Sequence, residues 1–150
     1  MPKISFACDH RGFEVKDLIL DFLKKNNYQV EDCGTNSSEA ADYPDHMLKA
    51  AELIAKGQCE KGIGVCYTGI GSAIAANKVA GVRAALVKTT EEAKLSRAHN
   101  DSNMLILGAG FLSREALLAI IETWLKTPFE GGRHAQRVDK IKRYEERHCK

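Results

Sequence analysis

Residues 62–78 constrain the fold of this chain more than any other stretch, because they indicate a strand that turns through glycines into a helix. Residues 63–66 are a short apolar run typical of a buried strand, residues 67–71 contain Gly69 and Gly71, and residues 72–78 are rich in alanine. A helix that starts after such a turn points free backbone N–H groups and its positive dipole end at an anion. The stretch therefore predicts a parallel strand–helix unit with an anion pocket.

Cys66, at the end of this strand, has two interpretations on these residues alone. A thiol beside a helix N-terminus is expected to be partly thiolate near neutral pH, which would make Cys66 a base or nucleophile next to an oxyanion pocket. A cysteine in a tight strand–helix connection can equally be buried and inert. The loop by itself favours neither interpretation.

The rest of the chain repeats the alternation of strand and helix. Apolar runs predict about five strands, at residues 3–8, 28–33, 63–66, 83–87 and 103–107. Helical periodicity and capping residues predict about six helices, at residues 15–26, 42–57, 72–78, 89–98, from Ser113 to the break at Pro128, and 135–148. This order is typical of a three-layer αβα, Rossmann-like fold with a five-stranded parallel sheet. We expect residues 1–150 to form a single domain.

Polar residues follow three of the predicted strands, where such sheets bind their ligands. They are Asp9 and His10 after the first strand, the turn from Cys66 to Gly71, and the turn after the fifth strand. The Gly69-x-Gly71 turn lacks the third glycine of a dinucleotide fingerprint, and no Walker A pattern occurs. A bound nucleotide is therefore weakly supported.

Three further features leave alternatives open. Arg133 and Arg137 are four residues apart at a helix start, so they can clamp a phosphate or simply form a solvated basic face. His99 is a candidate proton donor or a helix cap. Asp9 and His10 are a candidate ligand-binding pair or a polar turn.

Charge and cysteine content exclude other classes of protein. The formal net charge of +2 is mixed along the chain, which argues against nucleic-acid binding. The five cysteines show no CxxC pair, so we expect reduced thiols and a cytoplasmic protein without a zinc ribbon. We see no signal-peptide pattern and no apolar run long enough for a membrane span, so no membrane partner is expected.

Five motifs occur in an order that resembles the ribose-5-phosphate isomerase B family over nearly the whole chain. They are Cys8-Asp-His-x-Gly12, Asp42-Tyr-Pro44, Cys66-x-Thr-Gly-Ile-Gly71 with Ile74-Ala-Ala-Asn-Lys78, Ser96-Arg-x-His-Asn-Asp-x-Asn103, and Gly131-Gly-Arg-His-x-x-Arg-Val138. The chain is similar, more distantly, to galactose-6-phosphate isomerase subunits.

The resemblance implies an isomerase that interconverts D-ribose 5-phosphate and D-ribulose 5-phosphate through an enediolate, with no metal or other cofactor. It implies that Cys66 is the base, that Thr68 relays hydroxyl protons, and that His99 opens the furanose ring. It also implies a homodimer with shared active sites, with a tetramer left open. The substrate-binding residues it implies are Asp9, His10, the backbone of Tyr67, Gly69, Ile70 and Gly71, and the side chains of Asn100, Arg133 and Arg137.

Two positions depart from the family pattern. The family usually has glycine where this chain has Tyr67, and a phosphate-contacting arginine where it has Gly110. We expect Gly110→Arg to tighten phosphate binding, unless Arg11, Lys78 or another basic residue already fills the gap.

Two other functions stay open at this point. One is isomerisation of a six-carbon sugar phosphate, such as allose 6-phosphate or galactose 6-phosphate. The other is sugar-phosphate binding without turnover. Exchange of the substrate's C2 hydrogen with solvent separates an isomerase from a binding protein.

Overall fold

The structure is a computed structural model that describes residues 1–148. Five parallel strands form one sheet in the order β2-β1-β3-β5-β4. All pairs are parallel because a helix separates each strand from the next one along the chain. The strands are β1 (Lys3–Cys8), β2 (Gln29–Asp32), β3 (Lys61–Cys66), β4 (Ala84–Leu86) and β5 (Met104–Gly108).

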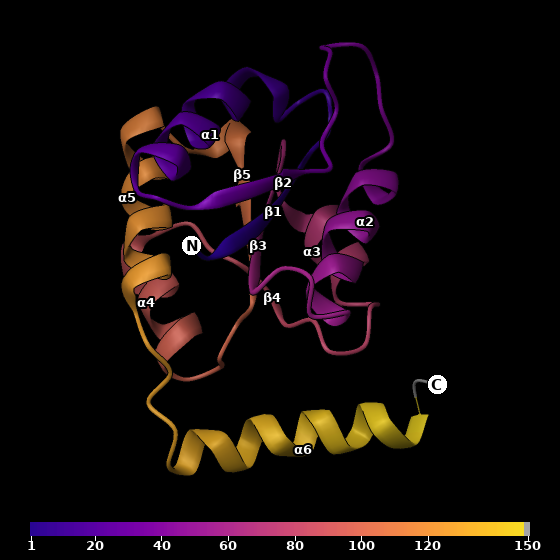
Figure 1. Ribbon diagram of the computed structural model, residues 1–150, viewed down its shortest axis with the longest axis vertical. Coiled ribbons are helices and arrows are strands. Elements are labelled where there is room, and N and C mark those ends of the chain that lie inside the picture. Colours follow the sequence, from indigo (N-terminus) through magenta and orange to yellow (C-terminus); the bar gives the residue numbers. More distant parts are fainter. Residues whose placement is uncertain (149–150) are drawn as a thin grey trace.

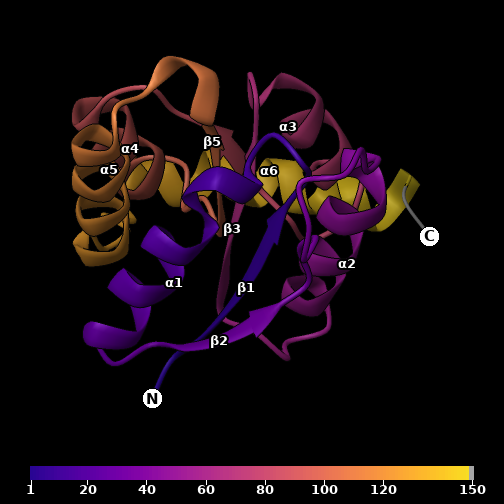
Figure 2. The same cartoon turned by 90° about the horizontal axis from the view of Figure 1, so that it is seen from above.

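Helices cover both faces of the sheet, so the predicted three-layer αβα fold is confirmed. Helices α1, α4 and α5 lie on one side, and α2 and α3 on the other (Figures 1 and 2). The α-helices are α1 (Lys16–Lys25), α2 (Tyr43–Ala55), α3 (Ile70–Ala76), α4 (Thr90–Ala98), α5 (Arg114–Lys126) and α6 (Arg133–His148). Two short 3-10 helices, η1 (Phe13–Val15) and η2 (Ala109–Phe111), follow β1 and β5.

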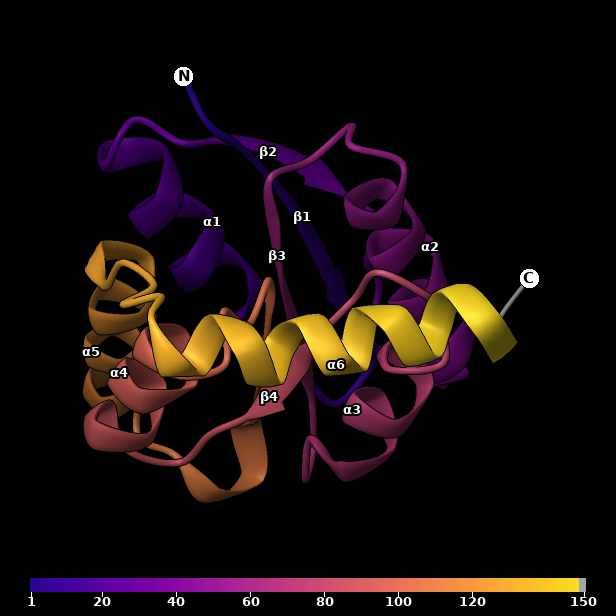
Figure 3. The same cartoon turned by 90° about the horizontal axis from the view of Figure 1, so that it is seen from below.

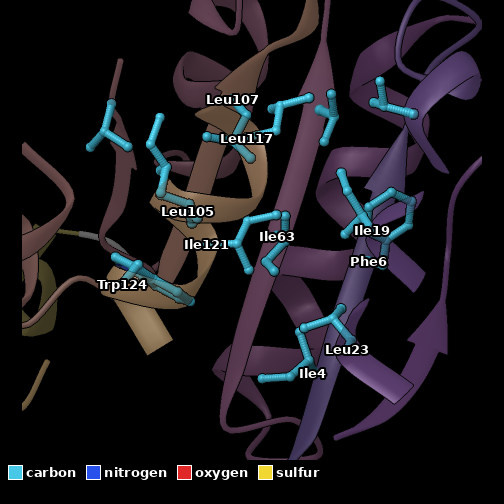
Figure 4. Packing of buried hydrophobic residues seen from close by; sticks show 14 of the residues in the cluster. Ile4, Phe6, Ile19, Leu23, Ile63, Leu105, Leu107, Leu117, Ile121 and Trp124 are labelled. Carbon is cyan, nitrogen blue, oxygen red and sulfur yellow. The ribbon is translucent and has the colours of Figure 1, made fainter. Parts of the chain in front are cut away.

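The larger core lies between the sheet and helices α1 and α5. Alternate residues of a strand point to opposite faces, so Ile4 and Phe6 of β1 share this face with Ile63 of β3. They pack against apolar residues of both helices, including Ile19, Leu23, Leu117, Ile121 and Trp124 (Figure 4). Burial of these side chains fixes the register of the sheet and therefore the positions of the loops at its edges.

The opposite face packs more closely against α2. A Cβ atom added to Gly64 would lie 2.6 Å from Met47 Sδ. Ala50 and Ala51 of α2 are fully buried on this side. Small residues on both elements let the helix approach the sheet.

The predicted helix caps are confirmed, and two helices start earlier than predicted. The side chains of Thr89 and Ser113 accept from backbone N–H groups of α4 and α5. Helix α3 begins at Ile70 rather than residue 72, because Gly69 takes a φ of +82° and turns the chain directly into the helix. Helix α6 begins at Arg133 rather than residue 135, after Gly131 and Gly132, which also have positive φ.

Helix α6 crosses the sheet at the edge where the strands begin (Figure 3). It is the longest helix in the described part of the chain, with 16 residues. Within residues 1–148, no helix is both long enough and apolar enough to cross a membrane.

Candidate active site

Cys66 ends β3 at the carboxyl edge of the sheet, and its side chain is 5% exposed. The N–H of Gly69 donates to Cys66 Sγ over 3.2 Å. The left-handed conformation of Gly69 makes this hydrogen bond possible, because it turns the chain back sharply over the sulfur. A Cβ at this position would also lie 2.4 Å from Leu86 Cδ1, so only glycine fits.

The turn after Cys66 leaves several backbone donors free. The N–H of Ile70 donates to Thr68 Oγ1 over 3.1 Å, so the hydroxyl proton of Thr68 stays available. The N–H groups of Thr68, Gly71 and Ser72 have no acceptor within residues 1–148. Free donors at the N-terminal end of a helix form a pocket for an oxyanion.

Ser72 was not identified from the sequence as a site residue. Its side chain is fully buried in the first turn of α3, yet its hydroxyl has no hydrogen-bond partner in the described part of the chain. A hydroxyl among apolar residues gives no sequence signal that separates it from a helix residue turned to solvent. Only its burial distinguishes it.

Asp9 and His10 lie in the turn after β1, at the same edge of the sheet. Asp9 Oδ1 accepts from the N–H groups of Arg11 and Gly12, over 2.9 and 3.0 Å. His10 Nδ1 lies 3.1 Å from the backbone nitrogen of Ala41 and 3.3 Å from its carbonyl oxygen, so this ring nitrogen ties His10 to Ala41. One carboxylate oxygen of Asp9 therefore holds the turn, and the ring of His10 is anchored through Nδ1, with no hydrogen bond to Nε2 within residues 1–148.

A cavity of about 210 Å³ opens beside these residues. It lies where the turns after β1, β3 and β5 meet. Its lining is His10, Arg11, Glu14, Val15, Tyr67, Ala109 and Gly110.

The other predicted site residues lie at the opposite edge of the sheet. His99 and Asn100 follow α4 and come just before β5, whose first residue, Met104, pairs with Gly62. Cys66 lies four residues beyond Gly62, which is about 13 Å of strand. Arg133 and Arg137 are in the first turns of α6, which crosses this same edge. One chain therefore presents two half-sites that do not meet.

His99 is supported by two residues to which the sequence assigned no role. Its ring stacks on His134, with centroids 4.1 Å apart and planes 11° apart. Glu130 Oε1 lies 3.5 Å from His134 Nε2 and 4.0 Å from His99 Nε2. The Glu130–His134 spacing of four residues was visible in the sequence, but the contact with His99 is tertiary.

The pKa of His134 is lowered from its ordinary value, first by burial and then by the nearby positive groups of His99 and Arg133. The neutral form of His134 is therefore favoured. The donor atoms of His99, Glu130 and His134 lie within 4.8 Å of one another. The three side chains therefore form one cluster, in which the carboxylate of Glu130 lies beside both imidazole rings.

Comparison with known proteins decides the family. A sequence model of the Ribose/Galactose Isomerase family matches residues 4–141. The chain belongs to this family. Ribose-5-phosphate isomerase B of Escherichia coli is 44% identical over 147 residues, which cover 98% of this chain and 99% of that protein.

Solved structures of ribose/galactose isomerase relatives superpose closely on this chain. Ribose-5-phosphate isomerase B of Clostridium thermocellum matches with a TM-score of 0.95 at 48% identity, covering 98% of this chain and 99% of that one. The Mycoplasma genitalium enzyme, solved with bound ribulose-5-phosphate, matches with a TM-score of 0.93 at 41% identity, covering 96% of both chains. The resemblance inferred from five motifs is therefore confirmed.

Proposed function

We propose that this chain is an aldose–ketose isomerase that interconverts D-ribose 5-phosphate and D-ribulose 5-phosphate. The observation that carries the proposal is the buried Cys66 thiol facing a turn with free backbone donors. Proton removal next to a carbonyl needs a base and charge stabilisation where the oxyanion grows. The Cys66 turn offers both, and relatives at 41–48% identity carry the name ribose-5-phosphate isomerase B.

In this proposal Cys66, as thiolate, takes the proton from C2 of the open-chain aldose. The C–H electron pair forms the C1–C2 double bond, and the carbonyl electrons move to O1, giving an enediolate held by N–H groups of the turn from Tyr67 to Gly71. The thiol then returns the proton to C1. Thr68 carries a hydroxyl proton between O2 and O1, which completes the ketose without a metal or other cofactor.

The remaining residues bind and open the sugar. We assign ring opening to His99, a hydroxyl contact to Asn100, and the phosphate to Arg133 and Arg137, whose guanidinium groups suit an oxyanion. Asp9 and His10 bind the sugar beside Cys66. Stacking on His134 holds the ring of His99 in place.

We further propose that the active unit is a homodimer in which each site takes one half-site from each chain. Two observations support it. The half-sites lie at opposite edges of one sheet. Apolar side chains on α3 and α6 are also more than half exposed in the single chain: Ile70, Ile74, Ile141 and Tyr144. A tetramer of such dimers is compatible with the same arrangement.

Two more assignments complete the proposal. We treat residues 1–150 as one sugar-phosphate isomerase domain. We assign it to the cytoplasm, because Cys8, Cys33, Cys59 and Cys66 are all free thiols in the structure. Cys149, the fifth cysteine, lies outside the described residues.

A ketose-formation assay with a panel of aldose phosphates tests the function. We expect the highest kcat/KM with ribose 5-phosphate, and lower values with allose 6-phosphate and galactose 6-phosphate. In deuterium oxide, the C2 hydrogen of ribose 5-phosphate should exchange with solvent. Absence of exchange with every sugar would identify a binding protein instead.

A further inference from the structure

Tyr67 and Gly110 form one packed unit at the carboxyl edge. A Cβ atom added to Gly110 would lie 2.4 Å from Tyr67 Cε1, so the tyrosine ring fills the space into which any side chain at position 110 would grow. The N–H of Gly110 donates to Tyr67 O over 2.9 Å, and the ring of Phe111 lies 5.7 Å from that of Tyr67. An arginine at position 110 would therefore have to displace the ring of Tyr67, so the structure favours the alternative in which Arg11 already fills the gap and Gly110→Arg does not tighten phosphate binding.

Arg11 lies against the same ring. Its guanidinium carbon is 5.0 Å from the centroid of Tyr67, within the range of a cation–π contact. Its backbone N–H is held by Asp9 Oδ1 over 2.9 Å. The guanidinium has no ion pair or hydrogen bond to any residue in the range 1–148. Arg11 is exposed, and an arginine that lies against a ring without an ionic partner keeps its donors for a bound molecule.

The cavity of about 210 Å³ lies against this arginine. His10 and Arg11 contribute the basic groups of its lining, and Glu14 is the acidic one. Tyr67 directly follows Cys66, so a sugar whose carbonyl end lies at Cys66 can extend its other end into this space. A planar guanidinium bound side-on is the group best shaped to hold a phosphate there.

We propose that Arg11, positioned by the ring of Tyr67, binds the phosphate of the substrate in the cavity beside Gly110. This inference rests on the proposed function and adds Arg11 as a binding residue and the Tyr67 side chain as a positioning group. In the dimer, Arg11 meets the phosphate from one chain, and Arg133 and Arg137 meet it from the other. Relative to the family pattern, Tyr67 replaces a glycine and Gly110 replaces an arginine. In this proposal the two changes belong together, because they move the phosphate-binding basic group from position 110 to position 11.

The test compares Arg11→Gln with Arg114→Gln, a matched loss of one arginine near the same edge. Within residues 1–148, the side chain of Arg114 makes one hydrogen bond, a donation to the carbonyl oxygen of Glu14 over 3.5 Å. Loss of a charged donor to phosphate should raise both KM for ribose 5-phosphate and the inhibition constant of inorganic phosphate about ten- to hundred-fold. The kcat of Arg11→Gln should change by less than about threefold, since the phosphate is remote from the reacting carbons. Arg114→Gln should leave all three constants within about twofold.

Two variants of Tyr67 test the positioning role. Tyr67→Leu removes the ring face and should weaken phosphate binding about two- to fivefold, whereas Tyr67→Phe keeps the ring and should bind more tightly than Tyr67→Leu. In an Arg11→Gln background the two Tyr67 variants should bind phosphate equally. A difference that persists there would show that Tyr67 acts independently of Arg11 and would overturn its positioning role.

Calorimetric titration with inorganic phosphate separates this inference from the proposed function, because it needs no turnover. If the wild type bound phosphate but isomerised no sugar, the proposed function would fail, and Arg11 would still be tested by its effect on binding. If Arg11→Gln bound phosphate as tightly as the wild type, with an unchanged KM, the inference about Arg11 would be overturned. Far-ultraviolet circular dichroism of each variant confirms that it is folded.

Discussion

Cys66 and His99 lie at opposite edges of one sheet, Cys66 at the carboxyl end of β3 and His99 just before the start of β5. A sugar cannot touch both in a single chain, because the sheet separates them by the length of its strands. If both act on one substrate, they must come from different chains. The separation of Cys66 and His99 therefore makes a dimer a requirement of the proposed mechanism, and this requirement can be tested.

Mixing two inactive variants tests that requirement. Cys66→Ala and His99→Asn should each be nearly inactive alone, but a mixed dimer has one intact site. Random re-association of equal amounts should therefore recover about a quarter of the wild-type activity. Each variant refolded by itself is the control. If the mixture were no more active than the two refolded variants added together, Cys66 and His99 would not share a site across chains.

Cys66→Ala should lower kcat about 10²- to 10⁴-fold, the usual scale for a general acid or base. Iodoacetamide should inactivate the wild type, and bound ribose 5-phosphate should protect it. The other described thiols are poor targets, because burial raises the pKa of Cys8 to about 11 and also raises the pKa values of Cys33 and Cys59.

Cys33→Ala is the matched control, since Cys33 is partly exposed, whereas the other described thiols are buried. It should be inactivated by iodoacetamide at the wild-type rate. Full activity in Cys66→Ala would end the assignment of Cys66 as the base.

His99→Asn should separate ring opening from proton transfer. Ribulose 5-phosphate reacts as an open chain and has no furanose ring to open. Exchange of its C1 hydrogen with deuterium oxide therefore reports on the Cys66 step alone. Conversion of ribose 5-phosphate should fall about 10²-fold or more, while this exchange falls far less. Nuclear magnetic resonance follows both. Equal losses would indicate that His99 takes part in the proton transfer itself or supports the structure.

The lowered pKa of His134 predicts a pH-dependent stability. Below the ordinary histidine pKa of 6.5, the unfolded chain takes up a proton at this position more readily than the folded chain does. The contribution of His134 to the free energy of unfolding is thus fully present above the pKa of 6.5. It is lost as the pH falls through the lower pKa that His134 has in the folded chain. The drop in Tm between about pH 7.5 and about pH 5.5 should be smaller in His134→Gln than in the wild type. Equal drops would contradict the inference that His134 is held neutral.

Much of the architecture could be predicted from the sequence, because it depends on local chemistry. Apolar periodicity located the strands and helices, and the hydroxyls of Thr89 and Ser113 marked helix starts, since a cap bonds to a backbone only three residues away. The turn from Cys66 to Gly71 was also predictable, because positive φ at Gly69 is encoded by the residue itself. Helix α3 still began two residues before its predicted start, since the residues inside a turn do not show where the helical hydrogen bonds begin.

The arrangement of the site was decided by tertiary structure. Nothing local to Tyr67 indicates that its ring lies over Gly110 and contacts Arg11. These residues are 43 and 56 positions away from Tyr67 in the chain. The stacking of His99 on His134 likewise joins α4 to α6. The sequence by itself determined which elements form and which residues carry the chemistry. Packing of those elements decided which of these residues meet, because contacts between distant segments depend on how the core places the edges of the sheet.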